Sequence, residues 1–183
     1  MLKRILFFVI AFKLILFFNL FGTTKEIITN PDLKKIIVAK IDDEPITYEE
    51  FEKFLELFKK KPKTLDEKLK MLNNLIARKL IIEDAKKKGY FNRKDIKENL
   101  KKHKFLKKSG EITLVLKLYF YENISKKVKI TEEEINKFIK KHKGINKHTA
   151  KEIIAVEKEK KLFDELIKRL KKGRKIIIFK DNL

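Results

Sequence analysis

One signal for the start of a helix occurs three times in this chain, and it constrains the fold more than any other feature of the sequence. In each copy a threonine is followed three residues later by a glutamate; the pairs are Thr47 with Glu50, Thr64 with Glu67, and Thr131 with Glu134. In such a capping box the two side chains satisfy backbone N–H groups that the first helical turn leaves without partners. Apolar residues follow each box at helical spacing, so we predict helices over about 47–60, over 65–88 and after residue 131.

Two further segments predict helices. Asn92, followed three residues later by Asp95, predicts a more polar helix to about Lys108, and an apolar stripe predicts a last helix over 149–172. Glycine often adopts the left-handed conformation that ends a helix, and three glycines stand at predicted helix ends. They are Gly89, Gly144 and Gly173.

Residues 111–121 (EITLVLKLYFY) are ambiguous. Their apolar positions fit the strand period of two and the helical period equally well, so periodicity alone does not separate the two structures. In a chain otherwise heavy with lysine, a segment apolar on all sides predicts either a central core helix or one that covers a binding surface.

Two short β-branched segments flank the helices. Residues 36–41 (IIVAKI) and 175–179 (KIIIF) read as strands, and we expect them to pair because each would otherwise be a lone edge. After the first strand, the acidic run 42–44 suits either a hairpin turn or a catalytic or Ca²⁺-binding role, and turn chemistry favours the hairpin. The predicted fold class is mainly α: about five helices plus a small β element that pairs the N- and C-terminal strands.

The N-terminus predicts export. Lys3 and Arg4 precede an apolar run over residues 5–21 that contains Lys13. A signal peptide and an N-terminal membrane anchor both have this pattern, and Lys13 favours a cleaved signal because a lysine inside a bilayer is costly. A buried core helix of a cytosolic protein is the third alternative. We expect residues 1–22 to be the signal or anchor, residues 23–35 a linker, and the location periplasmic or extracytoplasmic.

The charge has two explanations once export is considered. The net charge is +21, and +18 remains on residues 23–183 after the three basic residues of the N-terminus are set aside. In a cytoplasmic protein such a charge would indicate that the partner is a nucleic acid. Export argues against that partner, so we predict no binding of nucleic acid. Lysine runs such as 59–61 and 86–88 are either solvated helix ends or a surface for anionic lipid headgroups. The second alternative predicts a basic structural or interaction protein at a membrane surface, in contact with the inner membrane.

No motif in the sequence indicates catalysis. The absence of cysteine excludes disulfides, thiolate zinc sites and a thiol nucleophile. Phosphate-binding loops, nucleophile elbows and zinc-binding helix motifs are also absent. His103, His142 and His148 all lie among lysines, whereas a metal needs neutral ligands close together. We therefore predict no metal, no cofactor and no catalytic residue.

Four segments resemble motifs of the SurA, PpiD and PrsA group of exported chaperones. Residues 38–51 (VAKIDDEPITYEEF) resemble the opening motif of that group, and residues 72–89 resemble a helix that ends in lysines and a glycine. Residues 119–141 resemble the following helices, and residues 157–179 resemble the helix and strand that close the domain. Many members carry a parvulin-type peptidyl-prolyl isomerase domain between the last two motifs. Here a short loop over 143–149 takes that place.

The resemblance implies a SurA-like chaperone domain over residues 36–179, with the ambiguous segment helical and without isomerase activity. The implied partners are unfolded or nascent exported proteins, including those of outer-membrane protein assembly, held in an apolar cradle of the helices at 47–60, 65–88 and 111–127. The candidate peptide-binding residues are Phe54, Phe58, Leu72, Leu118, Tyr119 and Tyr121. An isomerase and a nucleic-acid binder remain as further alternatives.

Overall fold

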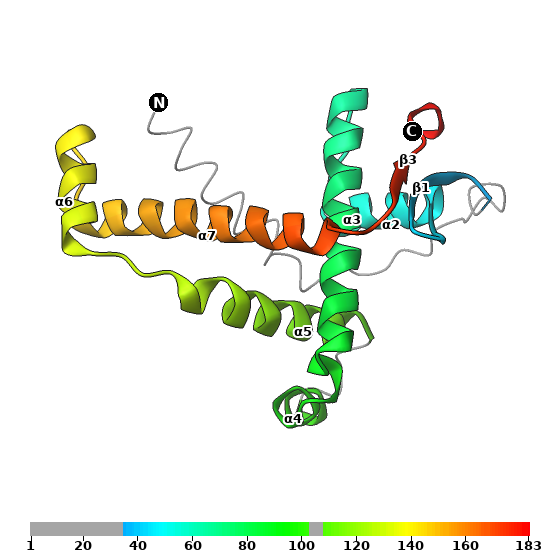
Figure 1. Cartoon of the computed structure of the whole chain (residues 1–183), viewed down its shortest axis with the longest axis horizontal. Coiled ribbons are helices and arrows are strands. Elements are labelled where there is room, and N and C mark those ends of the chain that lie inside the picture. Colours follow the sequence, from blue (N-terminus) through cyan, green and yellow to red (C-terminus); the bar gives the residue numbers. More distant parts are fainter. Residues whose placement is uncertain (1–34, 103–107) are drawn as a thin grey trace. The chain divides into compact units, whose positions relative to one another are not determined.

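The computed structural model describes residues 35–102 and 108–183, and within them the chain is mainly helical with one small antiparallel sheet (Figure 1). This confirms the predicted fold class. Six α-helices lie in the described residues, where about five were predicted. The predicted signal or anchor lies outside the described residues, as does the predicted linker apart from Lys35.

The elements follow one another as β1 (Ile37–Ile41), β2 (Glu44–Thr47), α2 (Tyr48–Leu57), α3 (Leu65–Lys87), η2 (Tyr90–Asn92), α4 (Lys94–Lys102), α5 (Lys108–Asn123), η3 (Ser125–Lys127), α6 (Glu132–Lys141), α7 (Lys147–Lys171), β3 (Ile176–Ile178) and η4 (Lys180–Asn182). They form two compact units. The sheet unit contains described residues 35–88 and 167–183, and the helical unit contains described residues 89–102 and 108–166. The single domain predicted over 36–179 stays a prediction.

The sheet unit joins the two ends of the described chain. Its strand order is β2-β1-β3, and both pairings are antiparallel, with Ala39 opposite Ile178 and Ile41 opposite Ile176. Figure 1 shows β3 beside β1. The predicted pairing of the N- and C-terminal strands is therefore confirmed. The acidic run forms the predicted hairpin turn, in which Asp42 has a left-handed φ of 54°.

Apolar faces of the sheet and of α2 and α3 build the core of the sheet unit. Helical spacing places Phe51, Phe54 and Leu55 on the buried face of α2, and Leu72, Ile76 and Leu80 on that of α3. Val38, Ile41 and Ile46 complete this cluster from the sheet. The C-terminal residues Leu170, Ile176 and Ile178 pack against it, so this core is shared by segments from both ends of the chain.

Two of the three predicted capping boxes are complete. At Thr47 and at Thr131 the hydroxyl accepts the glutamate N–H, and the glutamate carboxylate accepts the threonine N–H. At Thr64 only the hydroxyl half forms, because the carboxylate of Glu67 accepts the N–H of Lys63 at 2.7 Å. Each helix still begins where the motif predicted.

In the helical unit, the ambiguous segment 111–121 belongs to α5 and is helical, as the resemblance implied. The predicted polar helix forms as α4 up to Lys102, and its predicted continuation to Lys108 crosses residues that the structure does not describe. Only residues 142–146 separate α6 from α7. A small core of Ile135, Ile145, Ala150, Ile153 and Ile154 packs this turn together.

Candidate functional site

The six predicted peptide-binding residues fall in both units and differ widely in exposure. Phe54 and Leu72 are buried in the core of the sheet unit, and Tyr119 is buried in the helical unit. These three are core residues in this fold, so we correct their assignment to the surface of an apolar peptide-binding cradle. Their apolar character reflects packing, as the ring of Tyr119 on that of Tyr90 (centroids 5.2 Å apart) illustrates.

The other three predicted residues have exposed surface. Phe58 is half-buried, and its ring lies 4.7 Å from that of Phe54. Leu118 is half-buried in α5, and Tyr121 is 55% exposed, which is the largest exposure among the large apolar side chains of the described residues. The structure therefore keeps Leu118 and Tyr121 together on one helix as candidates.

Two apolar faces run along α5. Val115, Tyr119 and Phe120 are buried and hold the helix in its unit. On the opposite side, positions i, i+4 and i+7 are occupied by Leu114, Leu118 and Tyr121, which helical geometry places on one face. We call these three residues the α5 stripe. The first two are half-buried, so the stripe is a strip of incompletely covered apolar surface.

A polar cluster fixes the end of α5 beside the stripe. The Tyr90 hydroxyl donates to Glu122 at 2.7 Å, and Arg93 donates to the other oxygen of that carboxylate at 2.8 Å. These bonds, that from Tyr90 first, lower the pKa of Glu122, while burial raises the pKa of Tyr90. Arg93 also forms an ion pair with Asp95 at 2.9 Å. Because every carboxylate here is paired with a donor, the cluster can position α5 but offers no poised acid or base.

A second polar cluster ties the C-terminal segment to the sheet unit. Arg174 donates to Asp42 in the hairpin turn and to Glu83 on α3, the latter at 2.9 Å. The N–H of Lys175 donates to Asp42 at 2.8 Å, and this bond is the main reason that the pKa of Asp42 is lowered. The pKa of Glu83 is lowered first by its bond from Lys87 and then by that from Arg174.

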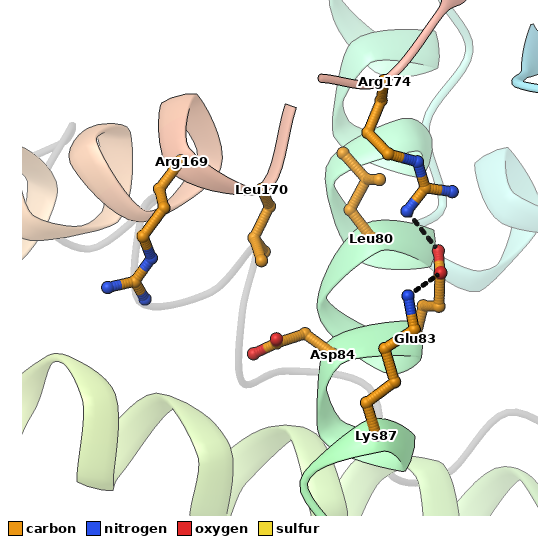
Figure 2. Close-up of a pocket in the computed structure, with 7 residues that line it drawn as sticks. All are labelled: Leu80, Glu83, Asp84, Lys87, Arg169, Leu170 and Arg174. Carbon is orange, nitrogen blue, oxygen red and sulfur yellow. Dashed lines mark hydrogen bonds and ion pairs between the residues drawn. The ribbon is translucent and has the colours of Figure 1, made fainter. Parts of the chain in front are cut away.

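Arg174, Glu83 and Lys87 line a cleft of about 160 Å³ together with Leu80, Asp84, Arg169 and Leu170 (Figure 2). Figure 2 shows Arg174 and Lys87 reaching the same carboxylate of Glu83 from opposite sides. Asp84 pairs with Lys88. The acidic side chains of the cleft are therefore already neutralised by protein cations. The cleft is best explained as part of the contact between the C-terminal segment and α3.

The histidines do not form a metal site in the part of the chain that is described. His142 lies against the ring of Phe138 (centroids 4.3 Å apart), and His148 lies 3.6 Å from Glu152, while His103 is outside the described residues. Within residues 35–102 and 108–183, no three metal-binding side chains gather. In the same ranges, no helix is both long and apolar enough to cross a bilayer.

Comparisons with known proteins found no matching family model, no matching curated protein and no matching solved structure.

Proposed function

We propose that this chain is an extracytoplasmic chaperone that holds unfolded or nascent exported polypeptides on the α5 stripe, without prolyl isomerase activity. The observation that carries the proposal is the incomplete burial of Leu114, Leu118 and Tyr121 on a helix whose opposite face is already packed. An apolar strip of this kind fits a partner with exposed apolar side chains.

The size of the stripe suits reversible holding. Full burial of one large apolar side chain contributes roughly 1.5–3 kcal/mol, and these residues are already partly covered. Together they supply a few kcal/mol, from which the cost of ordering a flexible client is subtracted. Affinity for any one client segment is then modest, so clients can leave in order to fold.

Charge complements this apolar contact. Lys117 is three residues from Leu114 and four from Tyr121, so it lies next to the stripe on the helix surface. With a net charge of +21, the chain also attracts acidic clients and remains soluble when a client is bound. The proposal requires no cofactor or metal.

Suppression of aggregation tests the proposal. The chain should slow the aggregation of a chemically unfolded exported protein. Leu118→Gln with Tyr121→Gln should require about 10- to 150-fold more chain for the same effect, because losing these contacts costs about 1.5–3 kcal/mol. Glutamine preserves helix propensity, and circular dichroism checks that α5 survives. Leu65→Gln is the matched control, since Leu65 is 47% exposed but lies on α3.

The proposal fails if the unaltered chain leaves aggregation unchanged, or if the double variant acts as well as the unaltered chain. A separate assay with a proline peptide checks the catalytic part, and any catalysed isomerisation contradicts it.

A further inference from the structure

The loop between α2 and α3 combines cations with exposed apolar side chains. Lys59, Lys60, Lys61 and Lys63 are all exposed. They are flanked by Leu57, which is 41% exposed, and by Leu65, which is 47% exposed. We call residues 57–65 the lysine loop. It belongs wholly to the sheet unit.

The charge of this part of the chain is segregated. Residues 35–58 contain three basic and seven acidic residues, a net charge of −4, whereas residues 59–63 contain four lysines and no acid. In the sheet unit, the lysines in ion pairs are Lys53, Lys79, Lys87 and Lys88, and within the described residues no ion pair engages a lysine of the loop. Of the nearest acids, Glu56 and Asp66 are exposed, and Glu67 is held by the N–H of Lys63.

Backbone strain at Lys59 adds an independent observation. The N–H of Lys60 bonds to the carbonyl of Leu55 and that of Lys59 to the carbonyl of Glu56, both at 2.9 Å, which is the Schellman end of a helix. Lys59 occupies the left-handed position of this motif with φ 50°. The left-handed residues that follow α3, α6 and α7 are glycines. A lysine held where glycine is favourable is a backbone outlier of the kind that gathers at functional sites.

From these observations we propose that the lysine loop docks the sheet unit onto a lipid surface that carries anionic headgroups. Lysine ammonium groups attract such headgroups, and leucines beside them can enter the boundary between headgroups and acyl chains. The net negative charge of residues 35–58 is repelled by the same surface, so the loop is the part that faces the lipid. A soluble polyanion would use the lysines but gain nothing from Leu65. This inference is independent of client holding by α5.

The test places a probe in the loop of the full chain. Because the chain has no cysteine, Leu65→Cys can carry a single environment-sensitive fluorophore, and Asn99→Cys on α4 provides a matched exposed site. Both labelled chains are mixed with vesicles of phosphatidylglycerol and phosphatidylethanolamine, and with vesicles of phosphatidylcholine alone. A local probe is needed because the apolar run over residues 5–21 can hold every variant near the lipid.

We expect the probe at position 65 to shift to the blue and to be quenched by nitroxide-labelled lipid, only in the anionic vesicles, while the probe at position 99 changes little. In the Leu65→Cys background, Lys60→Gln, Lys61→Gln and Lys63→Gln together should lower the ratio of docked to undocked loops about 100-fold, since each lysine contributes about fivefold. Lys97→Gln, Lys101→Gln and Lys102→Gln on α4 remove the same charge and should leave the ratio unchanged.

Four outcomes overturn the inference. The inference fails if the two probes respond alike, if the loop triple variant docks as well as the α4 triple variant, or if the probe at position 65 responds equally to neutral vesicles. A response at position 65 to a soluble polyanion but not to anionic vesicles assigns the loop to another partner and also overturns it. Failure of client holding leaves these readouts untouched, because Leu118 and Tyr121 are intact in every chain used here.

Discussion

Replacing the strained lysine at the end of α2 by glycine should stabilise the protein. An L-residue in the left-handed region costs roughly 1–2 kcal/mol, and Lys59 has φ 50°. Glycine removes that cost, but its greater conformational freedom stabilises the unfolded chain by about 0.5–1 kcal/mol. The N–H groups of residues 59 and 60 keep their bonds, so Lys59→Gly should raise the free energy of unfolding by about 0.5–1 kcal/mol.

Urea unfolding followed by far-ultraviolet circular dichroism measures this change. With a slope of about 1–3 kcal/mol per molar urea, the midpoint should rise by a few tenths molar. Lys61→Gly is the matched control, because it removes the same charge two residues away, where φ is not positive. That variant should lose about 0.5 kcal/mol instead.

The opposite signs separate strain from charge. If both variants become more stable by the same amount, relief of lysine repulsion is responsible and the argument from backbone strain is refuted. The docking inference adds a second expectation, that Lys59→Gly lowers docking on anionic vesicles about fivefold while raising stability.

Three further predictions concern the helix ends and the polar ties. Gly173→Ala should lower the free energy of unfolding by about 0.5–1 kcal/mol, because φ is 78° and nothing lies within 4 Å of the new Cβ, so strain of about 1–2 kcal/mol is offset only by the smaller freedom of alanine in the unfolded chain. A neutral result in urea unfolding would contradict the left-handed cap. Arg174→Met should lower the free energy of unfolding by about 1–2 kcal/mol, since it breaks the partly exposed bonds to Asp42 and Glu83. Lys53→Met, which breaks the exposed pair with Glu49, should lower it by under about 0.5 kcal/mol, and equal losses would refute a structural role for Arg174. The lowered pKa values of Asp42 and Glu83 give stability that is fully present above the ordinary carboxyl range, about pH 4, and is lost as the pH falls through the lowered native values. Urea unfolding at descending pH should show this loss, and Asp42→Asn with Glu83→Gln should flatten it; an unchanged slope would rule these groups out.

Local signals in the sequence predicted the elements well. The capping threonines at 47, 64 and 131 each stand at the start of a helix, because capping depends on side chains three residues apart. The pairing of β1 with β3 also followed from local signals, since both are short β-branched segments. The strand β2, which pairs with the other edge of β1, was not predicted. The segment within α5 was decided by resemblance, because periodicity favoured neither structure.

Side-chain burial and long-range ion pairs could not be predicted from local patterns. Tyr119 and Tyr121 lie two residues apart in one apolar run, yet one is 1% exposed and the other 55%, because their directions differ by about 200° around the helix. Which face is covered depends on the segments packed against it. The bond from Arg174 to Asp42 likewise joins residues far apart in sequence, and no sequence motif predicts it. Lys59 gave no signal either, since left-handed helix ends are expected at glycine.

Direct crosslinking at the α5 stripe tests the central claim. Tyr121→Cys carrying a benzophenone should crosslink to a chemically unfolded exported protein on illumination, and not to the same protein once it has folded. Asn99→Cys, exposed on α4, should give little product with either form. The chaperone proposal is contradicted if the probe at position 121 captures folded and unfolded protein alike, or captures no more than the probe at position 99.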